Sequence, residues 1–140
     1  MALCGAIAWG LAAAFPGGHL VLPHRTALGV AVLLAGIVLN VAPKRHFRRA
    51  GTTVDPMRPR NSTRLVQSGL HRWSRNPMYL GHAVILLGAA ILLANALAFA
   101  AVPVYVLYVT RFQILPEERA LQVRFGQDYR DYRRRVRRWL

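Results

Sequence analysis

The sequence predicts an all-α integral membrane protein with four transmembrane helices, a cytoplasmic loop between the second and third helices, and a basic amphipathic helix at the C-terminal end. Of its 140 residues 54% are hydrophobic, although the formal net charge is +14. The charges are segregated: no acidic residue falls in 56–116, and basic residues crowd into 44–75 and 111–138. Uncharged apolar runs between basic blocks are typical of a chain that crosses a bilayer.

The first two spans are expected at residues 3–22 and 26–42. The first is marginal, because Pro16-Gly17-Gly18 interrupts it and about 20 residues are needed to cross the bilayer. It lacks the basic start and the cleavage site of a signal peptide, so we interpret it as a membrane helix. The second span ends at Pro43 and basic residues follow at once. The positive-inside rule then places this end, and both termini, on the cytoplasmic side of the membrane, which we expect to be a bacterial inner membrane.

A long cytoplasmic loop is expected at residues 43–76. Its glycines and prolines argue against a continuous helix. Long connections in small proteins are usually functional or disordered, and we interpret this one as a lid or pocket wall.

The third and fourth spans are expected at residues 77–94 and 96–115, as a hairpin joined at Asn95. Asn76 is a suitable N-cap for the third span, and Pro77 suits the first helical position because it has no N–H to lose. Arg111 lies about one turn before the fourth span ends, where its side chain can reach the interface or point into a cavity.

Two glycines in the third span, Gly81 and Gly88, are one heptad apart. Small residues at that spacing predict close packing against a neighbouring helix.

The C-terminal segment, residues 116–140, is predicted to start a new helix at Pro116-Glu117-Glu118, with proline at the first position and carboxylates in the first turn. Apolar residues then recur every three or four positions among arginines. This pattern predicts a basic amphipathic helix on the inner membrane surface.

This topology would bring two helix N-termini, two carboxylates and several arginines together at one membrane–water boundary. Each signal also has a simpler interpretation. Glu117 and Glu118 can be helix-capping charges, Arg75 one more positive-inside charge, and Tyr79 an interfacial aromatic. His82 lies deeper in its span, where a polar group is more often functional.

Other classes of function find less support. The histidines show no metal-ligand spacing, so no metal site is expected. The basic blocks flank apolar spans, which favours a membrane surface over nucleic acid as their partner. The single cysteine, Cys4, excludes an internal disulfide and is expected to be a small buried hydrophobe.

Four groups of residues in 51–140 follow the order and approximate spacing of motifs in the isoprenylcysteine carboxyl methyltransferase family, and the chain resembles that family and the wider group of small membrane methyltransferases that includes the phospholipid N-methyltransferases. They are Gly69-Leu70-His71-Arg72, similar to G-P-Y-R; Arg75-Asn76-Pro77-Met78-Tyr79-Leu80-Gly81, similar to R-H-P-x-Y-x-G; Glu117-Glu118-Arg119-Ala120-Leu121, similar to E-E-x-x-L; and Phe125-Gly126-Gln127-Asp128-Tyr129-Arg130-Asp131-Tyr132 with Arg135-Val136-Arg137-Arg138, similar to F-G-E-E-Y-x-x-Y and R-V-P-R.

The resemblance implies S-adenosylmethionine as methyl donor and a lipid-soluble or lipid-anchored acceptor. It places the donor between the last transmembrane helices and the C-terminal segment. Carried over by position, the cofactor-binding residues would be Gly69, Leu70, Asn76, Pro77, Met78, Tyr79, Gly81, His82, Glu117 and Glu118. An arginine can hold a carboxylate substrate without taking its proton, and Arg75 is the first candidate for that role and Arg111 the second.

Two positions depart from the family pattern: Asn76 stands where a histidine is usual, and His71 where a tyrosine is. Because an amide does not titrate near neutral pH, the first departure removes any acid–base chemistry at that position, and the acceptor stays open between carboxylate, amine and thiol.

Two rival functions also stay open. One is an NADPH-dependent membrane reductase with a similar C-terminal hairpin, and the other a non-enzymatic scaffold whose basic faces bind anionic lipid.

Overall fold

The computed structural model describes residues 2–49 and 65–140, and residues 50–64 of the predicted lid lie outside them. The described regular structure is helical, which confirms the all-α prediction; the one β-type contact there is an isolated bridge between His19 and Asn95. The chain divides into two compact units. The first unit comprises Met1–Val38 and Gly81–Tyr108, and the second comprises Leu39–Leu80 and Val109–Leu140.

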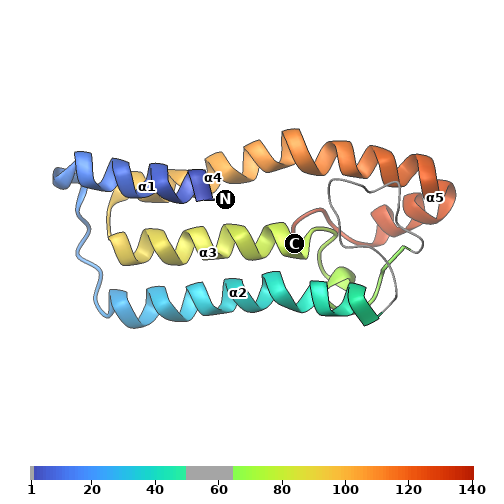
Figure 1. The fold of residues 1–140 in the computed structure, drawn as a ribbon, viewed down its shortest axis with the longest axis horizontal. Helices are drawn as coiled ribbons and strands as arrows, with labels where there is room; N and C mark the ends of the chain where they lie inside the picture. The colour runs from blue at the N-terminus through green and yellow to red at the C-terminus, as the bar shows by residue number, and fades with distance from the viewer. Residues whose placement is uncertain (1, 50–64) are drawn as a thin grey trace. The chain divides into compact units, whose positions relative to one another are not determined.

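The first unit holds α1 (Ala2–Ala14) and parts of α2 (Arg25–Arg49), α3 (Pro77–Leu93) and α4 (Ala96–Val109) (Figure 1). The predicted first span, residues 3–22, does not form one helix. Helix α1 ends at Ala14, and the short 3₁₀ helix Pro16–Gly18 follows, because proline and two glycines do not sustain an α-helix.

The predicted hairpin is confirmed, with α3 and α4 within one residue of the expected start of each span. Between them Ala94 adopts a left-handed φ of 47°. Asn95 is fully buried; its side-chain oxygen accepts from the Leu97 N–H (2.9 Å), and its amide donates to the Phe15 carbonyl (3.0 Å). Asn95 therefore caps α4 and fixes the connection that follows α1.

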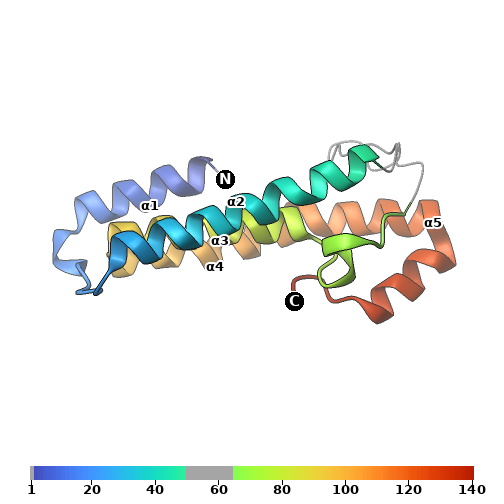
Figure 2. The same ribbon diagram turned by 90° about the horizontal axis from the view of Figure 1, so that it is seen from below.

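Helices α2 and α3 pack with backbone against backbone (Figures 1 and 2). A Cβ built on Gly88 would lie 2.7 Å from the Leu33 nitrogen, and one built on Gly36 would lie 2.6 Å from the Ile85 nitrogen and 2.9 Å from the Gly81 carbonyl oxygen. The predicted close packing at Gly81 and Gly88 is confirmed, and its partners are another heptad-spaced pair, Gly29 and Gly36.

Helix α2 continues through Pro43 to Arg49, and its long apolar stretch, Arg25–Lys44, ends near the predicted end of the second span. Proline removes one hydrogen bond from a helix interior but does not always end the helix. Here Pro43 is buried, and Asn40, one turn earlier, donates to the Met78 carbonyl at the start of α3 (3.0 Å). Packing in the second unit therefore holds the helix together past the proline.

The chain also stays helical from α4 into the second unit, where a π-helical turn, Thr110–Ile114, leads into α5 (Leu115–Arg135). Helix α5 therefore begins one residue before the expected start at Pro116, with the proline and both carboxylates in its first turn, but it continues the preceding helix and is not a separate one. The Leu115 N–H donates to the Thr110 carbonyl, five residues back, and this wider turn makes room for the proline that follows.

Helix α5 breaks at Gly126, whose φ of 50° and ψ of −115° suit only glycine (Figure 2). Beyond it Tyr129, Tyr132 and Val136 form a buried cluster with Leu65. The Tyr132 hydroxyl donates to the His71 carbonyl (2.7 Å) in the 3₁₀ helix Gly69–Arg72. The apolar stripe predicted to face the membrane surface thus packs inside the second unit.

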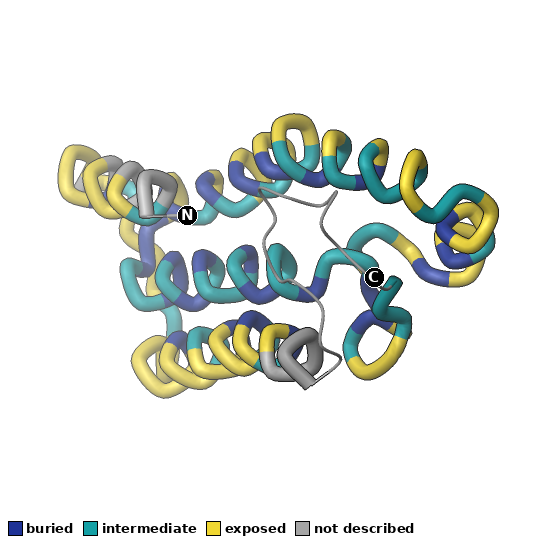
Figure 3. Tube along the Cα trace, turned by 45° about the vertical axis from the view of Figure 1, so that its right-hand side comes forward, coloured by how far each residue is buried: buried dark blue, intermediate teal, exposed yellow. Residues whose placement is uncertain are grey.

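Among the residues that the structure describes, two helices are long and apolar enough to cross a membrane, Arg25–Lys44 and the continuous helix Ala96–Arg135, whereas Pro77–Leu93 is shorter. On α2 many apolar side chains are exposed, and Figure 3 shows α3 more buried than α2. An exposed apolar face is what a helix presents to lipid. The four complete crossings and the orientation stay predictions.

Candidate active site

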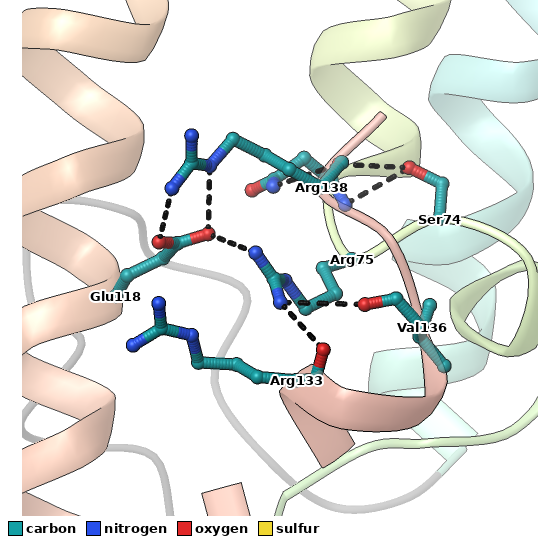
Figure 4. Close-up of polar contacts among 7 residues, drawn as sticks. Ser74, Arg75, Glu118, Arg133, Val136 and Arg138 are labelled. Carbon is teal, nitrogen blue, oxygen red and sulfur yellow. Dashed lines mark hydrogen bonds and ion pairs between the residues drawn. The ribbon is translucent and has the colours of Figure 1, made fainter. Parts of the chain in front are cut away.

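The turn before α3 and the segment after α5, residues 74–76 and 136–138, lie side by side in the second unit (Figure 4). The Arg75 N–H donates to the Arg137 carbonyl (3.0 Å). The Ser74 hydroxyl (3.3 Å) and the Asn76 amide (3.1 Å) both donate to the Arg138 carbonyl. These bonds fix the C-terminal segment against the entrance of α3, although more than 60 residues separate the two in sequence.

Glu118 lies at the centre of this arrangement, with only 5% of the residue exposed. Arg138 binds it at two points, Nε to Oε1 (3.0 Å) and Nη2 to Oε2 (2.9 Å), and Arg75 Nη2 also donates to Oε1 (2.8 Å). Burial acts to raise the pKa of this carboxyl, but the hydrogen bond from Arg138 and the charges of Arg75 and Arg138 outweigh it, so the pKa lies below its usual value. Glu118 is therefore a buried, ionised and doubly paired carboxylate.

Arg75 joins three parts of the unit. Its Nη1 donates to the carbonyls of Arg133 and Val136, both at 3.3 Å, while Nη2 binds Glu118. Within the described residues its Nε is buried without a hydrogen-bond partner. With both terminal nitrogens engaged, Arg75 holds the C-terminal segment and Glu118 in place in this structure. Its predicted role in binding a substrate carboxylate stays a prediction, and it would require these partners to be exchanged.

Glu117 has different neighbours from Glu118. Its Oε1 accepts from the Tyr79 hydroxyl (2.6 Å) and from the Gln113 amide (2.8 Å), which lies one turn earlier on the same helix. Burial raises the pKa of Glu117 above its usual value, and these two bonds offset only part of that effect. No cation pairs with Glu117 in these contacts, so a positively charged ligand would relieve its desolvation.

The two adjacent carboxyls therefore have pKa values that shift in opposite directions. Such a separation of neighbouring titratable groups is found more often at functional sites than elsewhere, although structural ion pairs produce it too. Glu118 is matched by two guanidinium groups, whereas Glu117 keeps its capacity for a cationic partner.

Three further predicted cofactor residues, Asn76, Pro77 and Met78, lie at the start of α3, between Arg75 and Tyr79. Asn76 is the N-cap residue of α3, since its carbonyl accepts from the Leu80 N–H (3.0 Å) and Pro77 follows as the first helical residue. Its side chain, expected to accept a capping bond, instead donates to Arg138. The Met78 carbonyl accepts from Asn40, as noted above.

Gly69 and Leu70 line a surface groove of about 440 Å³ in the same unit. Its other lining residues are Ala42, Pro43, Arg72 and Trp73. The groove is mostly apolar, and Trp73 is largely exposed beside it.

The remaining predicted site residues lie elsewhere. Arg111 is exposed and its guanidinium lies 5.6 Å from the centre of the Phe112 ring. Gly81 and His82 belong to the first unit, where Gly81 takes part in the α2–α3 contact and His82 Nδ1 lies 3.2 Å from the Tyr105 hydroxyl. The site roles predicted for Arg111, Gly81 and His82 stay predictions.

Sequence reasoning missed Arg138 and Gln113 as members of the cluster. Gln113 had a signal, because residues four apart on a helix are neighbours and Glu117 follows at that spacing. Arg138 belonged to the segment similar to R-V-P-R, but that resemblance gave it no role, and its contact with Glu118 depends on the break at Gly126 and on the return of the chain to α3.

A family model described as phospholipid methyltransferase matches residues 24–128. An uncharacterized protein of Haemophilus influenzae is 44% identical over 63 residues, which are 45% of this chain and the whole of that protein. A mouse protein-S-isoprenylcysteine O-methyltransferase is 37% identical over 75 residues, and methanethiol S-methyltransferase 1 of Bradyrhizobium diazoefficiens is 40% identical over 67. These matches cover about half of this chain (51% and 48%) but only 25% and 22% of the two named enzymes. No solved structure matches.

Proposed function

The chain belongs to the phospholipid methyltransferase family, and on that premise we propose that it transfers a methyl group from S-adenosylmethionine to a lipid-soluble or lipid-anchored acceptor at the membrane surface. The family and the apolar helices indicate a membrane protein. The methyl donor, the acceptor and the assignment of individual residues are our proposal, since the chain spans only about a quarter of its named relatives.

The observation that carries the proposal is the pairing of Tyr79 with Glu117 and of Arg75 with Glu118, at 2.6 and 2.8 Å. The tyrosine and arginine come from one stretch that resembles the methyltransferase motifs, and the two glutamates come from another, about 40 residues later. A scaffold with no ligand has no need to hold Glu117 partly desolvated with only neutral partners in the described contacts, because burying a carboxylate without a cation costs free energy.

The residues present fit the proposed donor, which carries a sulfonium and an ammonium group. Glu117 offers a carboxylate whose ionisation is opposed by burial and whose contacts are with neutral groups, and a cation beside it would favour the ionised form. Glu118 serves differently, because two arginines already neutralise it. We therefore assign the contact with the donor's cationic end to Glu117, and the support of the pocket wall to Glu118.

S-adenosylmethionine, when bound, supplies a methyl group that an acceptor's lone pair can attack in line as the carbon–sulfur bond breaks. Such a displacement asks the protein mainly to align the two reactants and to exclude water. A carboxylate acceptor gives up no proton, whereas a thiol, or an amine that is protonated at neutral pH, must lose one before its lone pair can attack. The protein's part is thus the fixed placement of Tyr79 and Glu117 by α3 and α5, and we also assign Gly69 and Leu70, which line the surface groove, to the donor site.

The relatives' names span acceptors of different chemistry, an isoprenylcysteine and methanethiol. For this chain we propose a lipophilic acceptor that enters from the bilayer and a donor that enters from the cytoplasm. The exposed apolar face of α2 and the basic residues of α5 are consistent with a site at that boundary.

The test is methyl transfer in membranes that contain the protein, with S-adenosylmethionine labelled with tritium in its methyl group. We expect label in the lipid extract with the wild-type protein and none above background with the double variant Glu117→Gln/Glu118→Gln. Mild alkali then separates the acceptors, because a methyl ester releases volatile methanol whereas a methylated amine or thioether does not. Equal labelling by wild type and double variant would refute the proposal.

A further inference from the structure

We propose that Arg138 is a positioning residue for the donor site: it fixes the orientation of Glu118 from the C-terminal segment, and through Glu118 it fixes Arg75 and the turn before α3. This inference rests on the proposed function, because the site it organises is the proposed donor site. It goes beyond that proposal in giving a specific task to one of nine arginines in the last 30 residues.

The first argument is the way the two oxygens of Glu118 are shared. Arg138 contacts both of them, while Arg75 contacts Oε1 alone. In the contacts recorded, Oε2 therefore depends on Arg138 (Figure 4). Without Arg138 the carboxylate would be free to rotate and to offer both oxygens to Arg75, which is the preferred geometry of an arginine–carboxylate pair.

The second argument is that the backbone of Arg138 is fixed independently of its side chain. Its carbonyl accepts from Ser74 and from Asn76, and the preceding carbonyl, that of Arg137, accepts from the Arg75 N–H. The guanidinium thus projects from an anchored segment, and only 32% of its side chain is exposed. A surface arginine that merely balanced the charge of Glu118 would need none of these backbone bonds.

The third argument concerns the next residue along α5. Glu117 and Glu118 are consecutive, so a rotation of the backbone or side chain at Glu118 is transmitted to Glu117, which binds Tyr79 and Gln113 through one oxygen. Fixing Glu118 by a two-point contact therefore also limits the movement of Glu117. A misplacement of about 1 Å in such a site can cost two orders of magnitude in rate.

Glu118 is surrounded by charged and titratable groups from each element packed against it. These are Arg75 before α3, Tyr129 and Arg133 on α5, Arg138 after α5, and Glu117 beside it. Arg138 contributes the largest effect that lowers the pKa of Glu118. Its loss therefore leaves Glu118 ionised over a narrower pH range, with Arg75 as the remaining partner.

The test compares three variants of the full-length protein in detergent. Arg138→Gln removes both the charge and the planar guanidinium that contacts Glu118 at two points, whereas Arg138→Lys keeps the charge but not the planar group. Arg137→Gln is the matched control, because the Arg137 side chain is exposed and only its backbone carbonyl takes part in the contacts. Calorimetry with S-adenosylmethionine should give a dissociation constant about tenfold higher for Arg138→Gln, the effect of losing one charged hydrogen bond. Arg138→Lys should remain at least about threefold weaker than wild type, and Arg137→Gln should bind within about twofold of it.

A second measurement does not involve the donor: the pH at which thermal stability falls on acidification. The folded-state pKa of Glu118 is lowered, so its contribution to stability is present above its unfolded pKa and is lost as the pH falls through the folded pKa. In Arg138→Gln the folded-state pKa of Glu118 should move towards the unfolded one, so this loss should be smaller and complete at higher pH than in wild type, while Arg137→Gln should behave as wild type.

The two measurements separate the possible failures. If the wild-type protein binds no S-adenosylmethionine, the proposed function fails, and the acid transition still reports whether Arg138 acts on Glu118. If the wild type binds and Arg138→Gln binds equally well, the positioning role is overturned. Full recovery of donor affinity in Arg138→Lys would overturn it as well, because charge alone would then suffice.

Discussion

Replacing Arg75 by methionine should destabilise the second unit far more than the loss of an ordinary surface ion pair. The side chain of Arg75 is only 9% exposed, and it donates to Glu118 and to the carbonyls of Arg133 and Val136. Methionine fills a similar volume with no donor, so the substitution removes these bonds without leaving a large cavity.

The expected magnitude follows from what stays unpaired. Removing one partner of a buried ion pair costs about 3–5 kcal/mol, because the other charge remains buried. Arg138 still holds Glu118 in the variant, so we expect the lower end, about 3 kcal/mol. For a chain of this length that loss corresponds to a decrease of about 10 °C in apparent melting temperature.

The assay is thermal unfolding of the detergent-purified protein near pH 7, with Arg134→Met as the matched control. Arg134 pairs with Asp131 at 3.8 Å, but 78% of its side chain is exposed. Such pairs contribute about 0–1 kcal/mol, so the control should melt within about 2 °C of the wild type. An Arg75→Met protein as stable as the control would refute the reasoning, since Arg75 would then not hold the C-terminal segment.

Three further predictions follow from individual positions. Gly88→Ala should destabilise the protein by about 1–3 kcal/mol, because its methyl group would lie 2.7 Å from the Leu33 backbone nitrogen. The control is Gly10→Ala in α1, where nothing lies within 4 Å of the new methyl group, so this substitution should be neutral or stabilising. Comparison of the two melting temperatures checks the prediction. Gly126→Ala should cost about 1–3 kcal/mol through backbone strain alone, since its Cβ also meets no atom within 4 Å, and a melting temperature equal to that of wild type would contradict the break assigned to α5. Glu117→Gln should raise the melting temperature at pH 7 and yet weaken donor binding. The folded-state pKa of Glu117 is raised, so its contribution to stability is present below its unfolded pKa and lost as the pH rises through the folded pKa. A lower melting temperature in the variant would contradict a raised pKa for Glu117.

The sequence predicted the parts of the fold that local chemistry specifies. Pro77 begins α3, Asn95 marks the hairpin, and Gly88 lies at a close helix contact, as expected from their positions in apolar runs. At Pro43 and Pro116 the helix continues for a common reason: proline removes one hydrogen bond but does not by itself end a helix when packing or a widened turn compensates.

The candidate site was predictable only in part. Glu117, Glu118, Tyr79 and Arg75 were identified through a family resemblance, and the structure brings them into two contacting pairs. The partner Arg138 was not identified, because its contact with Glu118 needs the positive φ at Gly126 and the return of the chain to the turn before α3. Such long-range returns leave no periodicity in the sequence.

The most direct test of the account is a calorimetric titration of the detergent-purified protein with S-adenosylmethionine, with NADPH as the comparison ligand. We expect saturable binding of the methyl donor, its loss in the double variant Glu117→Gln/Glu118→Gln, and no binding of NADPH. Binding of NADPH alone would contradict the account in favour of a reductase, and binding of neither ligand would leave the basic helix and its lipid contacts as the basis of function.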